Sequence, residues 1–254
     1  MTYCLTISVD AGMVFCSDSR TNAGVDQIST YSKMHKFGIE GERQFVLMTA
    51  GNLATAQAVV AQVQEDFDEH AALSLRTVRN VHDAADYVGD LSLEKQKKHG
   101  DDEGKFEASF ILGGQIGRSP HQATLIYPQG NHITTSASTP YLQIGESKYG
   151  KPILDRILAL DTSLETAALN ALVSMDSTMR SNLTVGPPIE LQIYEAADLA
   201  LRKDRYHCFT EDSEFLRELK RSWDARLKEA FSKLPPLAWS FTWDRESGER
   251  NEAS

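Results

Sequence analysis

Alternating hydrophobic and polar residues open the chain and predict a β-hairpin at its N-terminus. Leu5, Ile7 and Val9 occupy alternate positions with polar residues between them, which is the two-residue period of a strand with unlike faces. Ala11-Gly12 then predicts a tight turn. The run 13–17 predicts a second strand that is apolar on both faces.

Further along the chain, the spacing of apolar residues switches between that of strands and that of helices. A second pair of strands is predicted over 33–50, with a turn at Glu40-Gly41-Glu42. Helices are predicted at about 53–67, 76–98, 145–160, 162–175 and 210–234, and further strands at 106–116, 122–127, 132–135 and 189–194. Thr162 and Glu165 have the spacing of a capping box. Two groups of strands separated by helices favour two packed sheets with helices outside them.

The composition is that of a globular protein, and the charge narrows the classes of partner. Hydrophobic residues make up 41% of the 254 residues and charged residues 24%. A net charge of −10 argues against a broad surface for nucleic acid or anionic membrane. The sequence contains no signal-peptide pattern and no long apolar segment, so we expect a cytoplasmic protein without a membrane partner.

The cysteines and histidines do not predict a metal centre. Cys4, Cys16 and Cys208 have the spacing of neither a disulfide framework nor a zinc site. The seven histidines form no HxH or HxxxH pair. We therefore expect no structural metal and no cofactor.

Thr2 is a candidate nucleophile, because methionine aminopeptidase removes Met1 when the next residue is small. The mature chain would then begin with Thr2, whose hydroxyl can attack a carbonyl carbon while its own α-amine acts as the base. The reference pKa of an α-amine, ~7.7–8.0, leaves a neutral fraction near pH 7. The sequence also allows the simpler interpretation that Thr2 is only the first residue of a strand.

Two charged residues and a glycine follow at positions that suit this chemistry. Asp18 ends the second strand and Lys33 begins the third, so pairing of these strands would bring the two side chains together beneath Thr2. A cation there lowers the pKa of the hydroxyl and the amine. Gly51, between a strand and a helix, offers a backbone N–H to developing negative charge. The alternatives are a surface aspartate, solvated lysines and an ordinary turn.

The order and spacing of these residues resemble those of the proteasome β-subunit superfamily. Four blocks are most similar to its bacterial ancestral β-subunit branch, called Anbu. The blocks are SDSRTNAG (17–24), YSKMHKF (31–37), IGESKYGKPILDR (144–156) and NLTVGPPIEL (182–191). The resemblance covers the chain from Thr2 to about Tyr194.

This resemblance implies an α/β (α+β) fold, the four-layer αββα sandwich of the N-terminal-nucleophile hydrolases. It also implies that Thr2 attacks an amide carbonyl, that Asp18 and Lys33 tune its reactivity, and that the Gly51 N–H stabilises the oxyanion. The implied activity is that of a threonine-type peptidase or amidase.

The resemblance has consequences for substrate and assembly as well. Thr49 and Leu53 fall at positions that line the side-chain pocket for a peptide or amide substrate. The family assembles into rings or open rings, so we expect a large homo-oligomer. Energy-dependent unfolding would require a separate ATPase or operon partner, because the sequence contains no nucleotide-binding motif.

Two departures from the superfamily pattern lie around the expected α-amine. Glu146 occupies the place of a serine after Ile-Gly, and Ser147 stands one residue later. An Asp-x-x-Ser pair is replaced by Ser181 and Thr184, with Asn182 between them. These departures motivate two alternative functions: a catalytically weak or inert self-assembling scaffold of the same fold, or an amidase acting on a small modified peptide.

The C-terminal segment extends beyond the common core of the superfamily. We divide the chain into a proteasome-like domain at 1–203 and a C-terminal helix and aromatic tail at 204–254, which we expect to belong to the same domain. Apolar residues recur at every fourth position from Phe215 to Phe231. Trp239, Phe241 and Trp243 alternate after this helix, and exposed aromatic residues mark interfaces, so we expect the tail to dock on an adjacent protomer.

Overall fold

The N-terminal hairpin forms the middle of the first of two antiparallel sheets. The computed structural model describes residues 1–22, 28–97 and 106–235. In spatial order, the strands of this sheet are β10 (Tyr141–Gly145), β1 (Tyr3–Val9), β2 (Gly12–Asp18), β11 (Ile189–Glu195) and β12 (Tyr206–Phe209). The hairpin is confirmed, and both faces of β1 are buried, including the one that carries Thr6 and Ser8. One face of β1 packs against helix α4 (Leu164–Ser181), and the other faces the second sheet.

The second sheet contains the remaining long strands that the sequence predicts. In spatial order they are β5 (Met34–Ile39), β6 (Arg43–Gly51), β7 (Ala108–Ile116), β8 (Gln122–Ile126) and β9 (His132–Thr134). The turn between β5 and β6 is confirmed, with Gly41 at a φ of +74°. A short ladder of β3 (Arg20–Asn22) with β4 (Ile28–Thr30), which we did not predict, lies between the two sheets in sequence.

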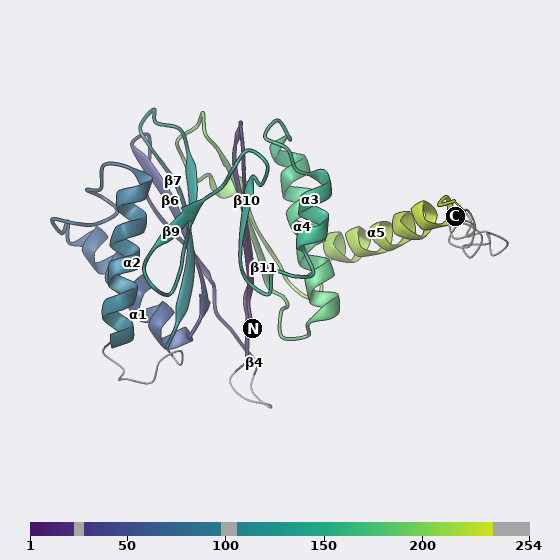
Figure 1. Ribbon diagram of the computed structural model, residues 1–254, viewed down its shortest axis with the longest axis horizontal. Helices are drawn as coiled ribbons and strands as arrows, with labels where there is room; N and C mark the ends of the chain where they lie inside the picture. Colours follow the sequence, from purple (N-terminus) through teal and green to yellow (C-terminus); the bar gives the residue numbers. More distant parts are fainter. Residues whose placement is uncertain (23–27, 98–105, 236–254) are drawn as a thin grey trace, which may run out of the picture.

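Helices cover the outer faces of both sheets (Figure 1). The second sheet is covered by α1 (Leu53–Asp68) and α2 (Val81–Lys97), and the first by α4 with the short α3 (Lys151–Ile157). The mixed α/β class and the two packed sheets with helices outside them are therefore confirmed. Helix α5 (Glu214–Ser232) projects away from the body after β12 and a short 3-10 turn, η1 (Lys203–Arg205).

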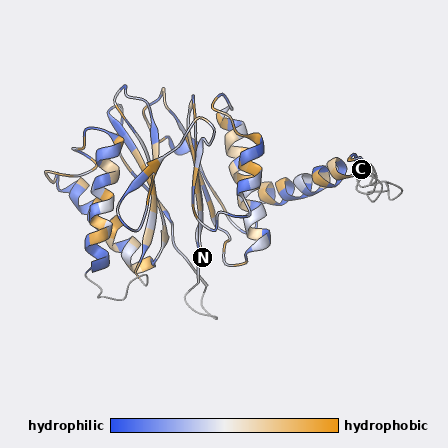
Figure 2. Cartoon of the chain, in the orientation of Figure 1, coloured by the Kyte–Doolittle hydropathy of each residue, from blue (hydrophilic) through white to orange (hydrophobic). Residues whose placement is uncertain are grey.

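Many of the apolar side chains of α5 are exposed. Leu216 and Leu219 pack against the first core, but Phe215 is 50% exposed and Phe231 is 76% exposed. Figure 2 shows hydrophobic and hydrophilic residues interspersed along the whole projecting helix. The expected aromatic tail at 239–243 and the last two residues of the block 17–24 lie outside the described residues.

Two helices begin later than the sequence predicts. Helix α2 begins at Val81 instead of residue 76, because Ser74 closes a turn in which its carbonyl accepts from the Thr77 and Val78 amides. Helix α3 begins at Lys151, since Gly145 still belongs to β10 and has a φ of +82° that no helix accommodates.

The capping box predicted for Thr162 and Glu165 at the start of α4 is wrong. Ser163, not Thr162, is the N-cap, and its hydroxyl oxygen accepts from the Thr166 amide at 3.2 Å. The Thr162 hydroxyl instead accepts from the Ala159 amide at 2.9 Å in the preceding turn. Either residue can cap a helix, so the choice depends on how the preceding loop folds.

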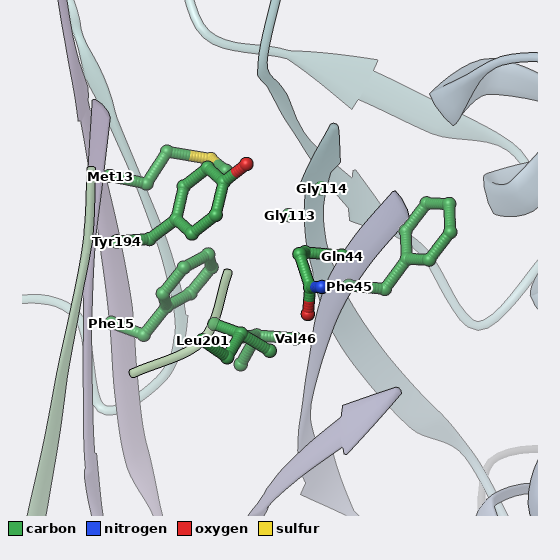
Figure 3. A pocket seen from close by; sticks show the side chains of 9 residues that line it. All are labelled: Met13, Phe15, Gln44, Phe45, Val46, Gly113, Gly114, Tyr194 and Leu201. Carbon is green, nitrogen blue, oxygen red and sulfur yellow. The ribbon is translucent and has the colours of Figure 1, made fainter. Parts of the chain in front are cut away.

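Close packing between the sheets fixes their separation (Figure 3). Phe15 on β2 lies opposite Gly113 on β7, where an added Cβ would be only 2.4 Å from the Phe15 ring. Met13 and Tyr194 complete the apolar contact from the first sheet. Within the described residues, no helix combines the length and the apolar character needed to cross a membrane.

Candidate active site

Asp18, at the end of β2, is a buried carboxylate with three hydrogen-bond donors around it. Its Oδ1 accepts from Lys33 Nζ at 2.8 Å and from the Tyr3 amide at 2.9 Å, and its Oδ2 accepts from the Gly186 amide at 3.3 Å. The side chain is fully buried. Because a buried charge is costly unless it is paired and hydrogen-bonded, these donors account for its presence in the core.

Lys33 reaches Asp18 from the other sheet. It immediately precedes β5, and its side chain is almost as buried, with 7% exposure. The ammonium also donates to the Arg20 carbonyl at 2.8 Å, while the Lys33 carbonyl accepts from the Thr49 amide at 3.1 Å. The expected meeting of Asp18 and Lys33 is confirmed, but the expected route is wrong, because β2 and β5 belong to different sheets and do not pair.

Burial and charge act in opposite directions on Asp18. Desolvation is the largest influence and raises the pKa of the Asp18 carboxyl, while the positive charge and hydrogen bond of Lys33 lower it. The Tyr3 and Gly186 amides lower it further. The ionised form of Asp18 therefore depends on its partners, Lys33 first among them.

Thr2 is held by its backbone between Asp18 and β10. The Thr2 carbonyl accepts from the Glu146 amide at 2.7 Å, and the next residue, Tyr3, donates its amide to Asp18. The absence of a side chain at Gly145 lets β10 come this close to Thr2, because an added Cβ would lie 1.9 Å from the Thr2 carbonyl oxygen. Thr2 itself is partly exposed, and it directly precedes the residue whose amide Asp18 binds.

Glu146 belongs to a second polar group around the start of the chain. Its Oε2 accepts from Asn182 Nδ2 at 3.0 Å, and Asn182 Oδ1 accepts from the Thr184 hydroxyl at 2.6 Å. Asn182 Nδ2 also lies 3.9 Å from the Met1 sulfur. Sequence reasoning placed Asn182 between two candidates but did not select it; its only signal was its position in the fourth block.

Two of the predicted supporting hydroxyls do not join this group. Ser181 is exposed at the end of α4, and Ser147 follows Glu146 at the start of the loop to α3. Among the described residues, no hydrogen bond connects either hydroxyl to Asp18, Glu146 or Asn182.

Arg20 is a further residue of this region that the sequence did not single out. Its amide donates to the Gly186 carbonyl at 3.3 Å, and its Nη1 donates to the Leu183 carbonyl at 2.8 Å. The guanidinium covers Gly186, where a Cβ would be 2.4 Å from Cζ. Arg20 thus fixes the loop before β11, and this loop supplies the Gly186 amide to Asp18.

The predicted oxyanion and pocket residues lie where β6 meets α1. Gly51 ends β6 with a φ of +104°, and Asn52 caps α1 by accepting from the Thr55 amide at 3.0 Å. Thr49 is buried beside β1, since its carbonyl accepts from the Cys4 thiol at 3.6 Å. Leu53 is the first residue of α1 and is 37% exposed. In the described ranges, no three His, Cys, Asp or Glu side chains gather in a metal-binding group.

These features define the class of the protein. Two packed antiparallel sheets, with a threonine directly before the first strand and a buried aspartate–lysine pair beside it, form a proteasome-like fold. The chain belongs to the Anbu family, the ancestral β-subunits, as its sequence blocks predict.

Comparison with solved structures establishes this membership. The chain is 42% identical to Anbu (ancestral beta-subunit) from Yersinia bercovieri, with a TM-score of 0.88, over 93% of this chain and 100% of that one. It is 43% identical to the Pseudomonas aeruginosa protein of a structure described as the helical assembly of the Anbu complex, with a TM-score of 0.89, over 94% and 100% of the two chains. No family model and no curated protein matches the chain.

The close approach of Gly145 to Thr2 can be tested by adding one methyl group. Gly145→Ala introduces both left-handed backbone strain and a collision with the Thr2 carbonyl, whereas Gly41→Ala introduces only the strain, because nothing lies within 4 Å of its Cβ position. We expect Gly41→Ala to lose ~1 kcal/mol in the free energy of unfolding, and Gly145→Ala to lose clearly more. Urea denaturation measures both, and equal losses would contradict the assigned contact.

The buried ion pair can be tested by a double-mutant cycle. Asp18→Asn and Lys33→Met each leave one buried charge without its partner, which typically costs ~3–5 kcal/mol. The double variant carries neither charge, so we expect it to lose much less than the sum of the two single losses. Additive losses in chemical denaturation would mean that the two side chains do not interact.

The pH dependence of the Lys33→Met variant gives an independent check. Burial raises the pKa of Asp18, and removing Lys33 removes the main opposing influence. A carboxyl whose pKa is higher in the folded state stabilises the fold fully below its unfolded pKa, and this contribution is lost as the pH rises through the folded pKa. We therefore expect the stability deficit of Lys33→Met to shrink as the pH falls from about 7 toward about 5. A deficit that is constant over this range would contradict the argument.

Proposed function

We propose that this chain is an N-terminal threonine hydrolase that cleaves amide bonds of peptides, with Thr2 as the nucleophile after removal of Met1. One observation carries the proposal: the Asp18 oxygen that binds Lys33 at 2.8 Å also holds the amide of Tyr3, the residue bonded to Thr2. A buried cation is thereby kept beside the candidate nucleophile. Met1 is 66% exposed and accessible to an aminopeptidase.

The proposed reaction divides amide hydrolysis into two steps. The Thr2 hydroxyl oxygen forms a bond to the substrate carbonyl carbon while the α-amine of Thr2 takes the hydroxyl proton. The C–N bond then breaks, and the proton passes to the leaving nitrogen. A water molecule hydrolyses the remaining ester and restores the threonine hydroxyl. Lys33 lowers the pKa of the hydroxyl and the amine, and Asp18 holds Lys33 in place.

The residues around β6 and α1 complete the proposed site. Gly51, which has no side chain of its own, offers its backbone N–H to the developing oxyanion at the end of β6. Thr49 and Leu53 line the side-chain pocket. We further propose that the two sheets and their helices are the four-layer αββα sandwich of the N-terminal-nucleophile hydrolases.

The polar group around the α-amine distinguishes this chain from a proteasome β-subunit. A carboxylate at Glu146 stabilises an ammonium on Thr2, so a smaller fraction of that amine is neutral and able to accept a proton than beside a serine. Asn182 binds this carboxylate, and Thr184 in turn binds Asn182 and holds its orientation. Ser147 and Ser181 have a supporting role only if their hydroxyls move toward the amine when the substrate binds.

Glu146 also favours a second candidate function. If the α-amine remains protonated, the chain is a catalytically weak or inert scaffold that keeps the fold for its assembly surfaces. An amidase for a small modified peptide is the third candidate, because the fold alone does not determine the substrate.

The proposed setting is a multi-subunit ring or open-ring assembly in the cytoplasm. The Pseudomonas aeruginosa relative forms a helical assembly, and the exposed apolar side chains of α5 provide a surface for contact with further copies. Residues 1–203 are the proposed proteasome-like domain, and residues 204–254 are its C-terminal extension and assembly interface. Protein unfolding would depend on a separate ATPase or operon partner.

Intact-mass spectrometry with a β-lactone or epoxyketone probe tests the nucleophile. We expect the purified protein to lack Met1 and to gain one adduct that maps to Thr2. Thr2→Ala should gain none, whereas Thr2→Ser keeps a hydroxyl and should still be labelled. An adduct that persists in Thr2→Ala would refute the assignment, and an unlabelled protein that lacks Met1 would favour the inert scaffold.

Truncation tests the assembly role of the C-terminal tail. Removing residues 235–254 deletes all three tail aromatics, whereas removing 245–254 leaves them in place. We expect only the longer deletion to lower the particle mass measured by light scattering. Unchanged mass after the longer deletion would show that the tail does not support assembly.

A further inference from the structure

Glu190 is a second buried carboxylate, on the strand next to that of Asp18. It lies on β11 opposite Ser17 of β2 and is only 6% exposed. Glu190 has no direct contact with Asp18 or Lys33 in the described residues, and the proposed chemistry does not use it. A buried carboxylate is costly unless its lone pairs are satisfied, so its partners indicate what it does.

The partners of Glu190 are the residues next to the catalytic pair in sequence. Its Oε2 accepts from the Ser19 hydroxyl at 3.1 Å and from the Ser32 hydroxyl at 2.8 Å. Ser19 directly follows Asp18, and Ser32 directly precedes Lys33. One carboxylate oxygen therefore binds both segments that carry the ion pair, at the point where they leave different sheets.

The Ser32 hydroxyl has two possible acceptors, and its bond to Glu190 is the stronger one. The single hydroxyl proton of Ser32 can go to Glu190 at 2.8 Å or to the Met34 carbonyl at 3.1 Å. Hydrogen bonds to an ionised acceptor are shorter and roughly twice as strong as neutral ones, so the Ser32 hydroxyl donates to the carboxylate. A backbone bond from the Tyr31 amide to the Ser19 carbonyl, 2.9 Å long, joins the same two segments.

The other oxygen of Glu190 is fixed from the C-terminal segment. Its Oε1 accepts from the Tyr206 hydroxyl at 2.6 Å. Burial raises the pKa of Tyr206, and the phenol therefore stays protonated and donates. Lys36 lies 3.5 Å above the centre of the Tyr206 ring and donates to Gln192 Oε1 at 2.7 Å, which holds the ring in place. Tyr206 is on β12, the edge strand that precedes α5.

We propose that Glu190 is a positioning residue that sets the separation of Asp18 and Lys33 through Ser19 and Ser32, and that Tyr206 connects this function to the C-terminal segment. The inference rests on the proposed function only for its catalytic consequence. The structural part, that the Glu190 group (Glu190, Ser19, Ser32 and Tyr206) joins the two segments, stands independently of any activity.

Two measurements on the full-length protein test the proposal. The variant Ser19→Ala/Ser32→Ala removes both donors and leaves Glu190 bound to Tyr206. Hydrogen exchange followed by mass spectrometry reports the Tyr31 amide, which we expect to exchange at least about tenfold faster in the variant. Inactivation by a β-lactone reports the site, and we expect kinact to fall about tenfold or more with KI unchanged, because small misplacements of catalytic groups have such effects.

A matched control separates positioning from general destabilisation. Ser92→Ala removes a buried hydroxyl, comparable in burial to that of Ser19, from α2, where it accepts from Gln96 at 3.0 Å, far from this site in the fold. It should alter neither measurement. Unchanged exchange at Tyr31 in the double serine variant would overturn the proposal whether or not the protein is labelled. A wild-type protein that is not labelled would refute the proposed hydrolase alone, since the exchange measurement still decides the role of Glu190.

A separate variant tests the connection between Glu190 and the C-terminal segment. Tyr206→Phe keeps the ring beneath Lys36 and removes only the hydroxyl that fixes Glu190. We expect faster exchange at Tyr31 here too, by a smaller factor than in the double serine variant. Exchange at the wild-type rate would overturn the link between β12 and the ion pair.

Discussion

The buried contact between Asp18 and Lys33 is the interaction on which the joining of the two sheets and the arrangement of the candidate site both depend. It joins the end of β2 in one sheet to the residue before β5 in the other, and it removes two charges from water. Such a pair persists only if further hydrogen bonds satisfy it, and these come from the backbone of the site itself: the amides of Tyr3 and Gly186 and the carbonyl of Arg20. The groups that stabilise the charges are thereby placed around the start of the chain.

Much of the fold was predictable from local sequence patterns. The predictions fail where contacts between distant segments determine the structure. The hairpin of β1 and β2 was predictable from alternation, but the burial of Thr6 and Ser8 was not, because it requires a sheet and a helix on opposite faces. Strand β12 is only four residues long and was missed, since it forms as an added edge beside β11. The choice of Ser163 over Thr162 as a helix cap depends on a loop that sequence spacing does not specify.

The candidate site divides in the same way. Thr2, Asp18 and Lys33 were predictable from their order along the chain, and the structure connects Asp18 to Lys33 and to the amide that follows Thr2. The residues around the amine were harder to predict from the sequence. Asn182 is bound to Glu146, while Ser147 and Ser181 remain apart from that group. Glu190 lies in the fourth block but was not singled out, because its role becomes visible only when Ser19 and Ser32 converge on one oxygen. This chain thus combines the buried Asp18–Lys33 pair with the acidic Glu146 next to the proposed base. The two features have opposite effects on the proposed reactivity of Thr2.

The central claim is that the buried cation activates Thr2, and the most direct test is the rate of β-lactone labelling in Lys33→Met. Intact mass must first show that Met1 is removed from both the variant and the wild type. If Lys33 activates the nucleophile, labelling of Thr2 in the variant should slow by about a hundredfold or more while the protein remains folded. Labelling at the wild-type rate would contradict the account, because the pair would then only join the two sheets.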